Sequence, residues 1–361
     1  MAICSGKGCC RRGANAAPSV RGPTDCATPV AAGHRWTLTD MEPWNWLGDH
    51  EATQKRRADL WRLLGPRPWR AGAAAGELLE ARETASARVE RWQLELNSEE
   101  AVPALLLRPL HQAPAGIVLY CHAHGNRFAT GKDELIAGRP ALQTPPYGEV
   151  LPALGYAVLA IDHWCFGERS GNSESAAVKR LLWEGKTLWG YRLHDSLVAL
   201  QWLRDRAEFK NLPVVTLGLS MGSTMAVWCA ALEPDISACI DLCCLADYDA
   251  LLADGSFDLH GEYFFVPGLL PEFSAAEISA LIAPRPHLSL AGKHDPLTPV
   301  AGIARIDADL KTAYASLGHS RNWRQQVHDC GHQETPAMRS QVLELLRALL
   351  CAEPGNRAGQ A

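Results

Sequence analysis

Apolar segments of four to seven residues recur along the chain and predict strands. The clearest, at 116–121, is apolar throughout, as expected for a strand covered on both faces. Further strands are predicted at 156–161, 214–217, 236–242, 287–290 and 323–327. Upstream, 88–96 alternates and 102–107 is apolar, with Asn97-Ser98-Glu99-Glu100 between them, which predicts an antiparallel hairpin.

Helical periodicity separates these strands. Leu193, Leu197, Leu200 and Leu203 mark a helix at 188–206. Other helices are predicted from Asp49 to Gly65-Pro66, at 150–154, at 307–317 and from Pro336 onward. A hairpin followed by repeated strand and helix units predicts an α/β fold, with a mostly parallel, doubly wound sheet and an antiparallel N-terminal hairpin.

Composition divides the chain into a domain and two tails. Residues 1–35 are rich in Gly, Ala, Pro, Arg and Cys without periodicity, and 354–361 are also polar and small, so both are predicted to be disordered. One domain is predicted at 36–353, with a helical lead-in and a core at about 87–353. We expect Trp36, Trp44 and Trp46 to pack onto this domain.

A Gly-x-Ser-x-Gly motif, Gly218-Leu219-Ser220-Met221-Gly222, follows the strand predicted at 214–217 and precedes a helical pattern. Strand, sharp turn and helix are the context of a nucleophile elbow. The turn strains the serine backbone, and the glycines remove Cβ atoms that would collide. Ser220 would then present its hydroxyl at the carboxyl edge of the sheet, with the Met221 amide facing a developing oxyanion. Ordinary glycine-rich turns between a strand and a helix match this motif too. Assigning Ser220 as a nucleophile therefore requires catalytic partner residues further along the chain.

A serine hydroxyl needs a neutral imidazole to accept its proton and a carboxylate to orient that imidazole. Asp295 follows the strand predicted at 287–290, and His332 lies between the last strand and the last helix. Asp295 has an alternative interpretation as a turn residue, since Asp-Pro favours turns. His328 competes with His332, but it lies in or next to the strand. Position and chain order favour Ser220, Asp295 and His332.

The loop after 116–121, His122-Ala123-His124-Gly125-Asn126, is predicted to supply a second oxyanion donor, the amide of Asn126. His122 and His124 have an alternative interpretation as a metal pair, but the next residues supply no further ligand. The chain has no Cys-x-x-Cys, no Gly-x-Gly-x-x-Gly after a strand and no P-loop. We therefore predict neither a metal nor a cofactor.

With these motifs placed, the chain resembles the α/β-hydrolase superfamily, most closely its serine-dependent dienelactone-hydrolase-like and acetyl xylan esterase-like branch. The resemblance runs from about Arg88 to Leu350. It rests on these motifs: 122–126, 131–134, 161–171, 218–222, 283–286, 292–295 and 331–332. It implies that Ser220 is the nucleophile, Asp295 the acid and His332 the base, with an oxyanion hole formed by the Met221 and Asn126 amides.

The chain departs from that family pattern at two positions. Dienelactone hydrolases proper use a cysteine nucleophile where this chain has Ser220. Many relatives carry a second glycine after the elbow, where this chain has Ser223. The serine at position 223 bears on the substrate that the resemblance implies more than on catalysis.

Two aromatic stretches, 164–189 and 248–273, are predicted to form helical insertions that cap the site. Such insertions suit a medium-sized organic ester, although about half of the aromatics are expected in the core. The predicted substrate pocket comprises His124, Trp164, His260 and Phe264.

Charge and composition exclude several classes of partner. The 361 residues carry a formal net charge of -5, which leaves no basic footprint for nucleic acid. No apolar run is long enough to span a membrane, and no apolar segment typical of a secretory signal follows Arg11-Arg12. Of the 12 cysteines, four lie in the first 26 residues and the others lie mostly in apolar runs, which favours buried reduced thiols and a cytoplasmic location. The predicted partner is a small-molecule ester, and assembly into a homo-oligomer is left open.

The predicted function is that of a serine hydrolase that cleaves carboxylic esters through an acyl-enzyme. A peptidase or amidase, a thioesterase and a lactone hydrolase would use the same triad. The lack of a propeller domain counts against a peptidase. The non-enzymatic alternative is a binding protein on a hydrolase scaffold.

Overall fold

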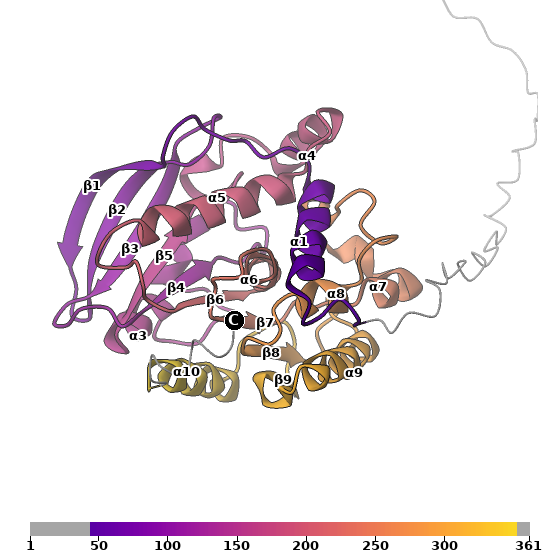
Figure 1. Ribbon diagram of the computed structural model, residues 1–361. Coiled ribbons are helices and arrows are strands. Elements are labelled where there is room, and N and C mark those ends of the chain that lie inside the picture. Colours follow the sequence, from indigo (N-terminus) through magenta and orange to yellow (C-terminus); the bar gives the residue numbers. More distant parts are fainter. Residues whose placement is uncertain (1–43, 352–361) are drawn as a thin grey trace, which may run out of the picture. The chain divides into compact units, whose positions relative to one another are not determined.

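The computed structural model describes residues 44–351, so the tails predicted at 1–35 and 354–361, and Trp36, lie outside the described residues. Within that range, one mixed sheet has the strand order β1-β2-β3-β5-β4-β6-β7-β8-β9 (Figure 1). The strands are β1 (Ala75–Glu83), β2 (Ala87–Glu95), β3 (Val102–Pro109), β4 (Gly116–Cys121), β5 (Tyr156–Ile161), β6 (Val214–Leu219), β7 (Ala238–Leu242), β8 (His287–Gly292) and β9 (Trp323–His328).

The sheet combines an antiparallel start with a parallel remainder. Strand β2 pairs antiparallel with β1 and β3, and β3 pairs antiparallel with β5. From β5 through β4, β6, β7 and β8 to β9 every neighbouring pair is parallel. The loops after these six strands therefore emerge at one edge of the sheet. The predicted fold class, a mostly parallel doubly wound sheet with an antiparallel hairpin, is confirmed.

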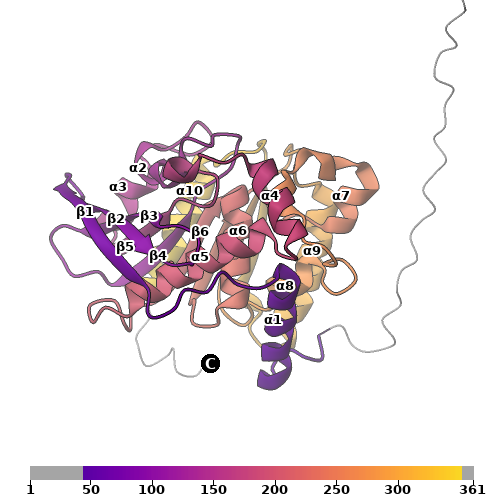
Figure 2. The same cartoon turned by 90° about the horizontal axis from the view of Figure 1, so that it is seen from above.

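Helices cover both faces of the sheet (Figure 1, and from above in Figure 2). The helices are α1 (His50–Leu64), α2 (Glu134–Ala137), α3 (Tyr147–Ala153), α4 (Glu174–Trp183), α5 (Leu188–Arg204), α6 (Met221–Leu232), α7 (Tyr248–Asp254), α8 (Ala275–Ala280), α9 (Val300–Ser316) and α10 (Pro336–Cys351). Helices α1, α5 and α6 share one apolar cluster on one face, whereas α3 and α10 share another on the opposite face.

The two clusters explain why the central strands read as unbroken apolar runs. In β4, Ile117 and Leu119 point into the cluster of α1, α5 and α6, while Val118 and Tyr120 point into the cluster of α3 and α10. Successive side chains of a strand point to opposite faces, and here both faces are covered.

The N-terminal edge departs from the sequence prediction, because β1 was not predicted. All nine of its side chains are exposed, so its sequence carries no burial pattern. Its backbone pairs with β2, with an irregularity between Leu78 and Glu80. The predicted packing of Trp44 and Trp46 is confirmed, since both lie partly buried against an apolar cluster with α8 and α9.

The two predicted insertions follow β5 and β7. The first contains α4, and the second contains α7 and two short 3-10 helices, 256–259 and 262–264. Helix α4 packs against the turn 262–264.

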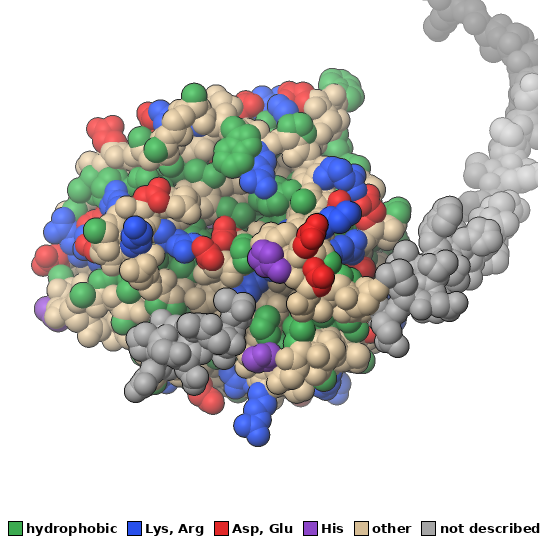
Figure 3. All heavy atoms as spheres, in the orientation of Figure 1, with side chains coloured by type: hydrophobic (Ala, Val, Ile, Leu, Met, Phe, Trp, Pro, Cys, Tyr) green, Lys and Arg blue, Asp and Glu red, His purple; other side chains and the backbone are tan. Residues whose placement is uncertain are grey.

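Surface and composition add three observations. No helix among residues 44–351 has the length and apolarity to cross a membrane. The eight cysteines in this range are all free thiols, and seven are buried. On the face drawn in Figure 3, acidic and basic side chains are interspersed.

Candidate active site

Ser220 occupies a sharp turn between β6 and α6. Its backbone has φ 60° and ψ -125°, a left-handed conformation that is strained for any residue with a side chain. A Cβ on Gly218 would lie 2.3 Å from Gly222, and one on Gly222 would lie 2.0 Å from the Cys121 carbonyl oxygen. Strand β4, strand β6 and helix α6 meet this closely because both positions are glycine. The turn geometry predicted from the motif is therefore present.

Asp295 and His332 meet between the loops that follow β8 and β9. His332 Nδ1 lies 2.7 Å from Asp295 Oδ2, and the carboxylate is fully buried. The loops are joined by backbone hydrogen bonds from Lys293 to His328 and from His294 to Cys330. The structure thus pairs His332 with Asp295, while the competing His328 lies at the end of β9.

The last residue of β7 and the residue after it connect the turn at Ser220 to the loop that contains His332. The Ser220 amide donates to the Leu242 carbonyl at 2.9 Å, and the next thiol, Cys243 Sγ, donates to the Gln333 carbonyl at 3.6 Å. Among residues 44–351, neither Ser220 Oγ nor His332 Nε2 has a hydrogen-bond partner. Such bonds are often long in unliganded enzymes and tighten when substrate binds.

The two predicted oxyanion donors differ in what they contact. Met221 is the first residue of α6, where amides lack carbonyl partners inside the helix. Asn126, with φ 55°, donates its amide hydrogen to His124 Nδ1 at 3.1 Å. An oxyanion would therefore share the Asn126 N–H with the ring of His124.

The predicted pocket residues fall into two groups. Trp164 belongs to the core: its indole N–H donates to Asp195 at 3.0 Å and only 7% of the residue is exposed. Its assignment to the substrate pocket stays a prediction. His260 bonds the Leu297 carbonyl at 3.0 Å and stacks on Phe264.

His260 lies near Asp295 and His332, and Phe264 borders an apolar cavity. Burial lowers the pKa of His260, while the Leu297 carbonyl and the neighbouring Asp295 oppose that shift. Phe264 lines a cavity of about 370 Å³ in the second insertion, together with Leu251, Phe257 and Val266. Their assignment to a substrate pocket stays a prediction.

His124 contacts a carboxylate that sequence reasoning missed. Its Nε2 lies 2.9 Å from Glu174 at the start of α4, and Glu174 also accepts from Arg192 of α5 at 2.6 Å. These residues are 50 and 18 positions from Glu174. No local pattern in the sequence signals such a contact.

His122 already uses both ring nitrogens in protein contacts. Nδ1 donates to the Ala123 carbonyl at 3.1 Å, and Nε2 accepts from the His163 amide at 3.3 Å. These bonds leave it unsuited to the metal pair with His124 that was considered above. Over residues 44–351, no group of three or more His, Cys, Asp or Glu side chains is arranged to hold a metal ion.

Burial of His122 predicts a loss of stability in acid. Burial lowers the pKa of His122 from 6.5 to about 3, so the unfolded chain takes up a proton that the folded chain does not. This difference in pKa costs no stability well above pH 6.5, and the cost grows as the pH falls from 6.5 toward 3. Between pH 7 and pH 5 the loss from His122 should be about 2 kcal/mol.

Urea unfolding at the two pH values checks this expectation. The variant His122→Phe should lose about 2 kcal/mol less than wild type on the same pH step, whatever its stability at pH 7. An equal loss in both proteins would show that His122 does not contribute to the acid sensitivity.

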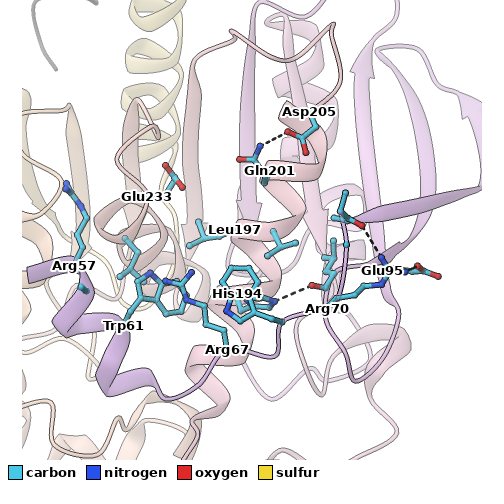
Figure 4. A pocket seen from close by; sticks show the side chains of 18 of the residues that line it. Arg57, Trp61, Arg67, Arg70, Glu95, His194, Leu197, Gln201, Asp205 and Glu233 are labelled. Carbon is cyan, nitrogen blue, oxygen red and sulfur yellow. Dashed lines mark hydrogen bonds and ion pairs between the residues drawn. The ribbon is translucent and has the colours of Figure 1, made fainter. Parts of the chain in front are cut away.

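A cavity of about 530 Å³ lies away from these residues (Figure 4). Trp61 of α1, Arg67 of the following segment and His194 of α5 are among its lining residues. It also reaches Leu232 and Glu233, at the opposite end of α6 from Ser220. None of the predicted site residues lines this cavity.

The strand order, with the sharp turn at Ser220 after the central strand β6 and with Asp295 and His332 after later parallel strands, is that of the α/β-hydrolase fold. The chain is 42% identical over 297 residues to the Bacillus subtilis (strain 168) protein named "Putative hydrolase YtaP", across 82% of this chain and 99% of that protein. The chain is therefore a member of the family of that protein. No protein-family model matches the chain.

Solved structures share the fold at low sequence identity. The glucuronoyl esterase from Solibacter usitatus aligns with a TM-score of 0.60 and 14% identity, covering 84% of this chain and 94% of that chain. Acetyl xylan esterase 1 from Thermoanaerobacterium sp. JW/SL YS485 aligns with a TM-score of 0.57 and 15% identity, covering 83% and 98%. At these identities the comparison concerns the fold.

Proposed function

We propose that the chain is a serine carboxylesterase in which Ser220, His332 and Asp295 act as nucleophile, base and acid. The observation that carries this proposal is the 2.7 Å contact between His332 Nδ1 and Asp295, at the same edge of the sheet as the strained turn of Ser220. Family membership supports hydrolysis, and the esterase names of the structures with this fold favour an ester.

The tautomer of His332 follows from its partner. Because a carboxylate only accepts, Nδ1 carries the hydrogen and Nε2 presents a lone pair. Nε2 takes the Ser220 proton as Oγ attacks the ester carbonyl carbon, and the carbonyl oxygen becomes an oxyanion that the Met221 amide stabilises. His332 then returns the proton to the leaving alcohol. In the second half, His332 activates a water that releases the acid and restores Ser220.

The same three residues can act on bonds other than carboxylic esters. Thioesters, lactones and amides would react through the same steps, and a binding protein on this scaffold remains the non-enzymatic alternative. The intact set of Ser220, Asp295 and His332 favours an enzyme over a binding protein. A small-molecule ester as partner and a cytoplasmic location remain predictions.

Hydrolysis of p-nitrophenyl esters, from acetyl to longer acyl chains, tests the proposal. We expect turnover of at least the short esters, with a chain-length profile that measures the acyl site, and faster cleavage than of the matching p-nitroanilides. We also expect covalent labelling of Ser220 by a fluorophosphonate. Inertness toward every ester and toward the fluorophosphonate would contradict the proposal and favour the binding protein.

A further inference from the structure

One largely buried carboxylate contacts a residue of the loop after β4 and a residue of α5. Glu174 is the first residue of α4, on an insertion rather than on the sheet, and its side chain is only 10% exposed. Its two oxygens lie 2.9 and 3.1 Å from His124 Nε2, and one of them lies 2.6 Å from Arg192 Nη2. Each of these two partners in turn contacts one of the residues whose amide is predicted to bind the oxyanion.

The first path runs through His124 to Asn126. Because the Asn126 amide can only donate, the His124 Nδ1 that it contacts must carry a lone pair. The ring hydrogen therefore sits on Nε2 and is donated to Glu174. Tyr263 stacks on the same ring at 4.9 Å. Glu174 thus fixes both the tautomer and the rotation of the ring that holds the Asn126 amide.

The second path runs through Arg192 to Met221. Arg192 is fully buried on α5, and its Nη1 lies 3.3 Å from Met221 Sδ. Its Nε and Nη2 donate to the Trp164 carbonyl at 3.3 and 2.8 Å. Among the ion pairs of residues 44–351, Glu174 is the carboxylate that balances this cation. It therefore also holds the side chain of the residue that opens α6.

We propose that Glu174 is a positioning residue for the oxyanion site, acting through His124 on Asn126 and through Arg192 on Met221. The inference rests on the proposed function, since it assigns those amides to an oxyanion. It makes the docking of α4 a condition for catalysis, because the carboxylate arrives with that helix.

The charge state of Glu174 agrees with this role. Burial by itself raises the pKa of the carboxyl group, but the hydrogen bond from His124 and the charge of Arg192 outweigh burial and leave the pKa below its ordinary value. The group is therefore an ionised acceptor at neutral pH, as both contacts require.

The variant Glu174→Gln tests the inference, with Glu262→Gln as its matched control. Glu262 is an exposed carboxylate in the second insertion that bonds Ser175, the neighbour of Glu174. We expect Glu174→Gln to lower kcat for p-nitrophenyl acetate by about 10- to 100-fold with KM within about threefold, because loss of a whole oxyanion donor costs about 10²- to 10³-fold. Fluorophosphonate labelling of Ser220 should slow to a similar extent. Glu262→Gln should match wild type in both measurements.

A double-mutant cycle with His124→Phe separates positioning from general support. His124→Phe keeps a ring against Tyr263 and removes both nitrogens. Because Glu174 acts through His124 as well as through Arg192, the loss in the double variant should be clearly smaller than the product of the two single losses. Additive losses in kcat, accompanied by matching losses in thermal stability, would overturn the inference in favour of a structural role. If Glu174→Gln does not fold, a folded His124→Phe with unchanged kcat would overturn it.

The outcomes distinguish this inference from the proposed function. Wild-type kcat and wild-type labelling in Glu174→Gln, with Ser220→Ala inactive, would remove the inference and leave the esterase proposal standing. A wild-type protein that neither turns over esters nor reacts with the fluorophosphonate would remove both.

Discussion

Replacing Ser220 with alanine should lower kcat for p-nitrophenyl acetate by about 10⁶-fold, the loss expected when a triad nucleophile is removed. Without Oγ no acyl-enzyme forms, and only the oxyanion donors and substrate binding still accelerate attack by water. Fluorophosphonate labelling should disappear altogether. Since alanine occupies the same backbone turn, we expect the thermal midpoint to stay within a few degrees of wild type.

The matched control is Ser223→Ala, the same change one helical turn further along α6. Ser223 is buried, and its hydroxyl lies 3.5 Å from Asp241 rather than at the sheet edge. This variant should keep wild-type kcat and wild-type labelling. Equal activity of Ser220→Ala and wild type would show that Ser220 is not the nucleophile.

Replacing Asp295 with asparagine should lower kcat by about 10⁴-fold without unfolding the protein. The asparagine amide group presents a donor to His332 Nδ1, which favours the tautomer with the hydrogen on Nε2. That tautomer has no lone pair at the position that must accept the Ser220 proton. The change is nearly isosteric, so KM should change far less than kcat.

Asp329→Asn provides the comparison for Asp295→Asn. Asp329 lies three residues before His332 and is exposed, where it pairs with His294. Steady-state kinetics of Asp329→Asn should match wild type. A large loss in Asp329→Asn together with a small loss in Asp295→Asn would reverse the assignment of the acid.

Burial determined which elements could be predicted from the sequence. Strands β4 and β5 have the residue bounds predicted from their apolar runs, because both of their faces are covered and nearly every residue reports that burial. Strand β1 has no such signal, since its side chains are all exposed and its position depends on backbone pairing with β2. A pairing made by backbone atoms leaves little mark on side-chain identity.

The site follows the same division between local and distant contacts. The sharp turn at Ser220 could be predicted because it depends only on neighbouring residues in the sequence. Gly218 and Gly222 are required there by the close approach of the backbone. The hydrogen bond from the Trp164 indole to Asp195 could not be predicted, because the two residues are 31 positions apart. The contact of Asn126 with His124 depends on a ring orientation that the sequence does not encode locally.

The order of β6, β7, β8 and β9 across the sheet repeats their order along the chain. Under the proposed mechanism, Ser220 is translated well before its acid Asp295 and its base His332, and His332 follows β9, the strand that completes the far edge of the sheet. Until His332 has been translated, Ser220 lacks its proposed proton acceptor. Under the proposed mechanism, hydrolytic activity begins only after translation has passed His332 and β9 has added to β8, so unfinished chains on the ribosome are inert toward esters.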